Sequence, residues 1–191
     1  MYIHFTGAQG TGKTTLLNQL VGESIKFDSG INIHTITNVV RNLVRREGVQ
    51  INKKGNSASQ NLIFNEYLKI FNGIDTNIDW VSDRSLIDVV AYTKYLYEHK
   101  KASKKCYESQ LQSLKLWCEE NLRVKDTLFV YFPIEFEVVN DGVRSLDEDY
   151  RKEIDKNIKD ILTDINVNYY IIEGSQDERL EMMKNIIWLN K

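Results

Sequence analysis

The chain has 191 residues, of which 42% are hydrophobic and 27% are charged, and its formal net charge at neutral pH is −2. This length and composition are typical of one globular domain, and we expect a single domain over residues 1–191. The acidic balance disfavours a protein that holds nucleic acid by bulk electrostatics. Basic side chains do gather in one stretch, which we interpret as a solvated surface: Lys94, His99, Lys100, Lys101, Lys104 and Lys105.

The sequence also disfavours membrane and zinc-binding classes of protein. Its apolar stretches are shorter than the roughly 20 residues that a membrane-spanning helix needs. The opening residues lead directly into the first motif and leave no space for a signal peptide, so we expect a cytoplasmic protein. Cys106 and Cys118 lack the spacing of structural zinc ligands.

In chain order, short β-rich runs alternate with longer helical patterns. Strands are expected at 2–6, 24–28, 78–82, 127–132 and 167–172. Helices are expected at 13–22, 33–47, 57–72, 85–98, 104–122, 148–165 and 176–189. This alternation is typical of an α/β three-layer sandwich, in which a five-stranded parallel sheet carries helices on both faces.

The first loop of the chain carries a phosphate-binding motif. Residues 7–14 read Gly-Ala-Gln-Gly-Thr-Gly-Lys-Thr, which matches G-x-x-x-x-G-K-[ST], the P-loop. In this motif the backbone N–H groups surround phosphate oxygens, Lys13 reaches the outer phosphates and the Thr14 hydroxyl ligates Mg²⁺. We therefore expect a P-loop NTPase fold that binds ATP and Mg²⁺ through Gly7, Ala8, Gln9, Gly10, Thr11, Gly12, Lys13, Thr14 and Thr15.

Asp83 and Arg84 directly follow the third expected strand. Ligands of such sheets bind outside the carboxyl ends of the strands, so both side chains are expected in the P-loop crevice. The carboxylate can hold Mg²⁺ or accept a proton, and the guanidinium can bind a phosphate. The alternative is a structural ion pair that caps the helix beginning at Ser85. Asp88, one turn further, either faces the site or favours the helix start.

Two residues near the second expected strand are candidates for binding the phosphoryl acceptor. Arg41 lies on the expected helix 33–47, where an acceptor can reach it, or it is simply solvated. Asp28 ends the expected strand 24–28 and is a second candidate proton acceptor, or a turn residue beside Gly30.

A short lid is expected at approximately 134–151. The segment contains an Asp-Gly turn followed by Arg144 and Arg151. A glycine-containing loop of this kind can close over phosphates and bring arginines to the charge that develops in phosphoryl transfer. The alternative is an ordinary turn that leads into an amphipathic helix.

With these motifs, the chain resembles the small P-loop kinases of the thymidylate-kinase-like group. It is also similar to short bacterial and phage AAA-type ATPase or kinase domains related to nicotinamide riboside kinase. The resemblance rests on GAQGTGKTTL at 7–16, DRSLIDVVAY at 83–92, DGVRSLDEDYR at 141–151 and YYIIEGSQDER at 169–179. It implies that Asp83 and Arg84 serve the metal and the acceptor, that Arg144 and Arg151 belong to the lid, and that Gly174 lies along the adenine.

One position departs from the family pattern. Relatives often carry an acidic residue three positions before the arginine of the second helix, where this chain has Asn38 before Arg41. The resemblance therefore leaves the acceptor open.

The expected function is an ATP·Mg²⁺-dependent phosphotransferase acting on a nucleoside or nucleoside monophosphate. Its catalytic residues would be Lys13, Asp83, Arg144 and Arg151; its metal ligands Thr14 and Asp83; its acceptor-binding residues Asp28, Arg41 and Arg84. A nucleotide-binding regulatory ATPase or switch is one alternative, and a polynucleotide 5′-end kinase is another. The sequence leaves the oligomeric state open, with a homodimer among the possibilities.

Overall fold

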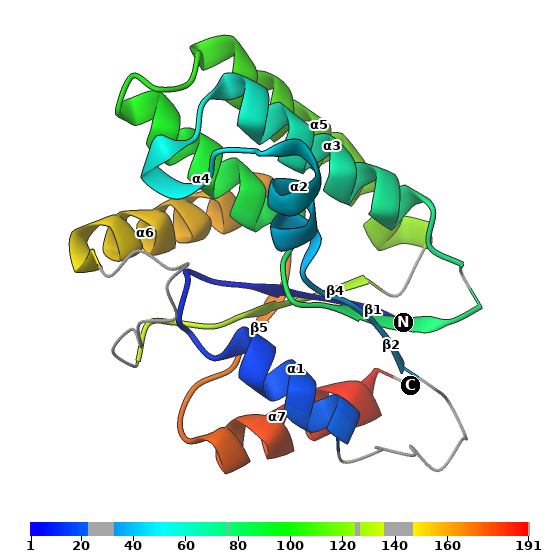
Figure 1. The fold of residues 1–191 in the computed structure, drawn as a ribbon. Helices are drawn as coiled ribbons and strands as arrows, with labels where there is room; N and C mark the ends of the chain where they lie inside the picture. The colour runs from blue at the N-terminus through cyan, green and yellow to red at the C-terminus, as the bar shows by residue number, and fades with distance from the viewer. Residues whose placement is uncertain (23–32, 76, 125–126, 136–146, 191) are drawn as a thin grey trace.

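A computed structural model describes residues 1–22, 33–75, 77–124, 127–135 and 147–190, which form three layers (Figure 1). The middle layer is a parallel sheet with the strand order β2-β3-β1-β4-β5. Its described strands are β1 (Tyr2–Thr6), β2 (Ile33–Ile36), β3 (Asp79–Ser82), β4 (Thr127–Tyr131) and β5 (Tyr169–Ile171). The structure thus confirms the expected five-stranded α/β sandwich.

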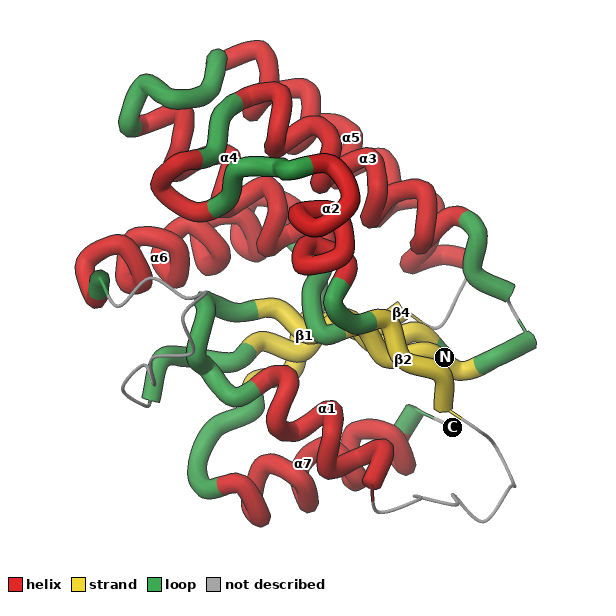
Figure 2. The backbone as a smooth tube through the Cα atoms, viewed as in Figure 1, coloured by secondary structure: helices red, strands yellow, loops and turns green. Residues whose placement is uncertain are grey.

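Helices cover both faces of this sheet (Figures 1 and 2). The first and last helices lie on one face, and the others lie on the opposite face. They are α1 (Lys13–Gly22), α2 (Val39–Glu47), α3 (Ser57–Asn72), α4 (Leu86–Glu98), α5 (Lys104–Val124), α6 (Glu148–Ile165) and α7 (Gln176–Leu189), with a 3-10 turn, η1, at Asn52–Lys54. Within the described ranges, none of these helices has the length and apolar character needed to cross a membrane.

The central strand β1 explains why the chain begins with an apolar run. All five of its residues are buried. Ile3 is paired with Val81 of β3 on one side and with Leu128 of β4 on the other. A strand covered on both faces reads as a continuous apolar segment because neither set of side chains meets water.

The sheet separates two hydrophobic cores. Side chains of β1, including Ile3 and Phe5, pack with Leu17 of α1 and Met183 of α7 in one core. The larger core lies on the opposite face, where α3 to α6 bury residues such as Leu114. The two cores hold the strand ends in place, so the loops that follow the strands are presented from a rigid scaffold.

The expected helix at 33–47 was wrong in its first third. Residues 33–36 form β2, which pairs in parallel with β3 from Ile33, opposite Asp79, to Ile36, opposite Ser82. β-branched residues favour such a strand. Asn38 then adopts a left-handed φ of 59°, and α2 begins only at Val39. The expected strand at 24–28 lies outside the described residues.

Candidate active site

The P-loop joins β1 to α1 and has a backbone that requires glycine. The φ angles of Gly7, Gly10 and Gly12 are 152°, 73° and 88°, a region that other residues rarely adopt. A Cβ atom on Gly7 would lie 2.6 Å from the Phe132 carbonyl oxygen, next to the end of β4. The motif's first glycine therefore lets the loop pass close to the neighbouring strand.

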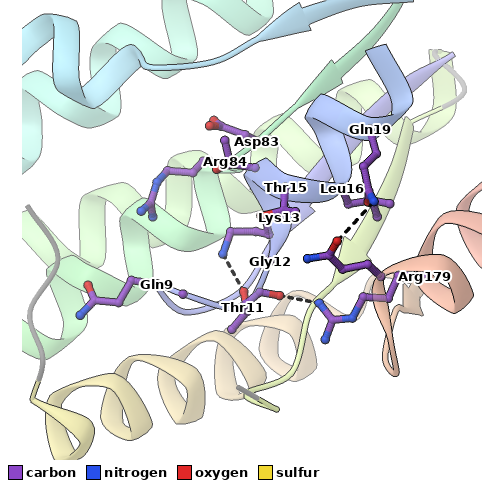
Figure 3. A pocket seen from close by; sticks show the side chains of 13 residues that line it. Gln9, Thr11, Gly12, Lys13, Thr15, Leu16, Gln19, Asp83, Arg84 and Arg179 are labelled. Atoms are coloured by element: carbon purple, nitrogen blue, oxygen red, sulfur yellow. Dashed lines mark hydrogen bonds between the residues drawn. The ribbon is translucent and has the colours of Figure 1, made fainter. Parts of the chain in front are cut away.

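The Lys13 ammonium group lies within the loop itself. Its Nζ donates to the carbonyl oxygens of Gly7 at 2.7 Å and Ala8 at 2.6 Å. It also donates to the Thr11 hydroxyl at 3.0 Å, the bond drawn in Figure 3. The side chain is buried, and these three acceptors are neutral. A phosphate oxygen is a stronger partner for an ammonium group than a neutral oxygen is, so the cation is ready to receive an anion.

Asp88 joins the P-loop to the start of α4. Its carboxylate is fully buried; Oδ1 accepts from the Gly7 N–H at 3.2 Å, and Oδ2 accepts from the Ser85 N–H at 2.9 Å and the Ser85 hydroxyl at 2.8 Å. The Ser85 hydroxyl accepts in return from the Asp88 N–H, completing a capping box. The two interpretations of Asp88 are thus both correct, since one carboxylate starts the helix and contacts the site.

Two cavities meet beside the P-loop. The first, of about 260 Å³, is lined by Gly10 to Leu16 together with Gln19, Gln176 and Arg179 (Figure 3). The second, of about 140 Å³, lies beneath α2, α3 and α4. Both cavities are lined by Gln9, Thr14, Asp83 and Arg84. Asp83 and Arg84, which directly follow β3, therefore lie at the boundary between the two cavities.

Asp83 occupies this shared wall in an environment that disfavours its charged form. Burial raises the pKa of the carboxyl above its ordinary value of 3.8, and the nearby Asp88 adds to this, while Arg84, Lys13 and Arg41 act in the opposite direction. Its backbone N–H donates to the Ile36 carbonyl oxygen of β2 at 3.1 Å, which fixes the turn. The approach of a further cation would stabilise the charged form of this carboxyl.

Thr14 and Asp83 have the chemistry that Mg²⁺ requires. Hydroxyl and carboxylate oxygens are hard ligands, and Mg²⁺ in phosphotransferases uses one or two of them together with water and phosphate oxygens. Both residues line both cavities, beside Lys13. The burial that raises the pKa of Asp83 would be offset by a bound cation. The residues present therefore fit a magnesium ion at this position.

The second cavity combines apolar walls with a few fixed polar groups. Arg84 lies with its guanidinium carbon 5.6 Å from the centre of the Tyr92 ring and its Nη1 4.0 Å from Asp88. Gln60 is buried, and its Oε1 accepts from the Thr93 hydroxyl at 3.2 Å. Burial also raises the pKa of Tyr67, which keeps that phenol neutral. Such a lining is typical of small-molecule sites.

The structure brings some predicted residues together and places others elsewhere. Arg41 and Arg84 line the second cavity, next to the P-loop. Asp28, Arg144 and most of the expected lid lie outside the described residues, so their roles stay predictions. Gly174 has a φ of 91°, and its N–H donates to the Glu135 carboxylate at 3.0 Å; its position along the adenine also stays a prediction.

Arg151 lies behind the P-loop in this structure. It belongs to α6 and is 1% exposed. Its Nε donates to the Gln9 carbonyl oxygen at 2.9 Å and its Nη2 to the Gly10 carbonyl oxygen at 3.2 Å. The expected catalytic role of Arg151 in a lid stays a prediction, whereas its contact with the loop backbone was not foreseen.

Sequence reasoning gave no role to Arg179, although it quoted the segment in which Arg179 lies. This side chain is 2% exposed, lines the first cavity and donates from Nη1 to the Thr11 carbonyl oxygen at 2.6 Å. A signal was available, because Arg179, Met183 and Ile186 are spaced four and three residues apart on the buried side of α7. A charged residue in such an apolar stripe indicates a buried polar role.

Several known structures share this fold. Deoxyadenosine kinase from M. mycoides, solved with the products dCMP and dCDP, is 15% identical, with a TM-score of 0.61 and full coverage of both chains. A NadR protein in complex with NR is 16% identical, with a TM-score of 0.69; all of this chain covers 51% of that chain, about half its length. Thymidylate kinase from Ehrlichia chaffeensis is 14% identical, with a TM-score of 0.58, and 97% of this chain covers 98% of it.

Sequence comparison gives a complementary result. No curated protein sequence matches the chain. An AAA domain family does match it, over residues 2–179, which is nearly the whole chain and includes the P-loop, Asp83 and Arg179. The chain therefore belongs to this AAA domain family, and its fold is that of the P-loop nucleoside and nucleotide kinases.

Proposed function

We propose that the protein is an ATP·Mg²⁺-dependent phosphotransferase whose acceptor is a nucleoside or nucleoside monophosphate. The observation that carries this proposal is the pair of adjoining cavities that share Gln9, Thr14, Asp83 and Arg84. Phosphoryl transfer needs a donor and an acceptor that meet in line at one point. A protein that only binds or hydrolyses a nucleotide has no need for the second cavity.

The first cavity suits the donor. The N–H groups of residues 7–14, the Lys13 ammonium and the start of α1 would hold the ATP phosphates. Thr14 and Asp83 would hold the metal, which when bound would neutralise phosphate charge. Positioning and electrostatics would supply most of the rate, because this reaction asks little covalent chemistry of the protein.

The second cavity suits an acceptor with a planar ring. Tyr67, Tyr92 and Ile63 contribute apolar surface, while Arg41 and Arg84 bring positive charge to the side nearest the P-loop. The similar structures include kinases named for deoxyadenosine and for thymidylate, which supports this acceptor class. In the transfer, the acceptor oxygen would bond to the γ-phosphorus, the bond from that phosphorus to the β,γ-bridging oxygen would break, and ADP would leave. A nucleoside acceptor would pass its hydroxyl proton to Asp83 or Asp28, whereas a monophosphate acceptor would attack through an ionised phosphate oxygen and release no proton.

The test is ATP consumption against a panel of nucleosides and nucleoside monophosphates, with the γ-phosphate radiolabelled. We expect label to appear in at least one acceptor, and Arg84→Gln to raise the acceptor KM. Arg46→Gln is the matched control, because Arg46 is exposed on the outside of α2 and pairs with Glu47 and Glu66. ADP release that needs no acceptor, with no labelled product, would refute the proposal and favour a regulatory ATPase.

A further inference from the structure

Three consecutive carbonyl groups of the P-loop are held by two buried arginines. Arg151 donates to the carbonyl oxygens of Gln9 at 2.9 Å and Gly10 at 3.2 Å, and Arg179 donates to that of Thr11 at 2.6 Å. The arginines come from α6 and α7, which lie on opposite faces of the sheet (Figure 1). We propose that they act as a clamp that fixes the P-loop backbone in its phosphate-binding orientation.

The argument follows from peptide geometry. In a planar trans peptide, the C=O of one residue and the N–H of the next point in opposite directions. Holding the carbonyls of Gln9, Gly10 and Thr11 on their arginines therefore fixes the N–H groups of Gly10, Thr11 and Gly12, each of which points away from the guanidinium that holds its own peptide. Gly10, Thr11 and Gly12 all line the first cavity. The donors that would bind phosphate are thus oriented before a ligand arrives.

Without such restraint this loop has wide conformational freedom. Gly10 and Gly12 take φ angles of 73° and 88°, but glycine populates the opposite sign of φ about as readily. A peptide flip would turn a carbonyl oxygen toward the phosphates and create repulsion in place of a hydrogen bond. Two charged donors on successive carbonyls oppose that flip, because each flip would break a charge-assisted hydrogen bond.

The charge balance of the clamp supports this role. Each guanidinium is nearly fully buried and pairs with a partly exposed carboxylate: Arg151 with Glu148 at 3.2 Å, and Arg179 with Glu135. A buried cation is costly unless it is paired and hydrogen-bonded. The carboxylates meet this cost in part. P-loop carbonyl oxygens accept from Nε and Nη2 of Arg151 and from Nη1 of Arg179, and the Gly174 carbonyl oxygen accepts from Nε of Arg179 at 2.9 Å.

This inference depends on the proposed function only in that the loop binds phosphate. It can be tested without catalysis, by titrating the purified protein with inorganic triphosphate and Mg²⁺ in a calorimeter. Arg151→Gln and Arg179→Gln should each weaken binding about tenfold or more, which is the value of a hydrogen bond to a charged group. Arg46→Gln is the control and should bind like the wild type.

Two further measurements separate orientation from charge and from folding. Arg151→Lys keeps the charge but replaces the separated Nε and Nη2 donors of the guanidinium with a single nitrogen, which cannot reproduce the fork geometry, so it should fold and still lose part of the affinity. In ¹⁵N spectra, the amides of Gly10, Thr11 and Gly12 should shift strongly on triphosphate binding in the wild type and weakly in the Lys variant. Wild-type affinity in folded Gln or Lys variants would overturn the clamp. Triphosphate binding without transfer to any acceptor would refute the proposed function alone.

Discussion

Asp88 links the P-loop to α4, and replacing it tests whether the site depends on that link. The carboxylate is fully buried and accepts from the N–H groups of Gly7 and Ser85 as well as from the Ser85 hydroxyl. Asparagine has the same shape but only one acceptor oxygen. Its oxygen can keep the Ser85 side, so its NH₂ group must then face the Gly7 N–H, where two donors oppose each other.

The size of the effect follows from these contacts. Asp88→Asn leaves the Gly7 N–H buried without an acceptor, which should lower the free energy of unfolding by about 1–3 kcal/mol. Asp88→Ala also removes the capping interaction at Ser85 and leaves a second N–H unsatisfied, so its cost should be about 3–5 kcal/mol. The Asn variant should bind inorganic triphosphate more weakly as well, because Gly7 begins the loop.

Urea unfolding gives the stability, and calorimetric titration of the folded variants gives the triphosphate affinity. Asp149→Asn is the matched control, since Asp149 lies exposed in the first turn of α6 and has only the helix dipole to lose, about 0.3–1 kcal/mol. A free energy of unfolding for Asp88→Asn equal to that of the control would show that the Gly7 contact contributes nothing. Unchanged triphosphate affinity would show that the link does not position the loop.

Other predictions concern single residues of the same site. Gly7→Ala should lower the free energy of unfolding in urea by about 2–4 kcal/mol, because the added Cβ would meet the Phe132 carbonyl oxygen at 2.6 Å and the φ of this residue is 152°. Gly22→Ala is the control; its Cβ would have nothing within 4 Å, so it should change that free energy by less than about 1 kcal/mol. Lys13→Met should weaken triphosphate binding about tenfold or more in calorimetry while the fold seen by circular dichroism is retained; equal affinity would remove Lys13 from the donor site. Burial raises the pKa of Asp83 in the folded state, so the native protein binds more protons at this carboxyl than the unfolded chain does. The stability that the protonated Asp83 contributes is therefore lost as the pH rises from the ordinary value of 3.8 through the folded pKa. Asp83→Asn should therefore match or exceed the wild-type melting temperature at pH 7 without ligand, yet show little phosphoryl transfer; a large drop in melting temperature at pH 7 would contradict the assigned burial effect.

The sequence placed the P-loop between the first strand and the first helix because one continuous motif forms it. Residues 7–14 have their spacing fixed by phosphate geometry, and Asp83 with Arg84 follows a recognisable strand. The sequence does not distinguish β2 from a helix, because Ile33–Ile36 is only four residues long and the helical pattern of α2 can be continued backwards through it. Only the pairing with β3, more than 40 residues away, makes it a strand.

The two arginines that hold the loop could not be assigned by spacing, because their partners in the loop are main-chain atoms. Arg151 and Arg179 are 141 or more residues from the P-loop carbonyl groups that they contact, and a carbonyl carries no residue-specific signal. The sequence could reveal that each lies on the buried side of an amphipathic helix. It could not reveal that α6 and α7 converge on the same loop from opposite faces of the sheet.

The first cavity gathers positive side chains beside the P-loop. Lys13, Arg84 and Arg179 line the first cavity, while the carboxyl that lines it, Asp83, is held in surroundings that disfavour its charge. Arg84 lies beside Asp88 and Arg179 is paired with Glu135, and a phosphate ligand would add a further anionic partner for all three cations. Triphosphate should consequently raise the melting temperature by mass action. A site arranged in this way gives up stability in the empty protein so that the loop need not reorganise when the nucleotide arrives.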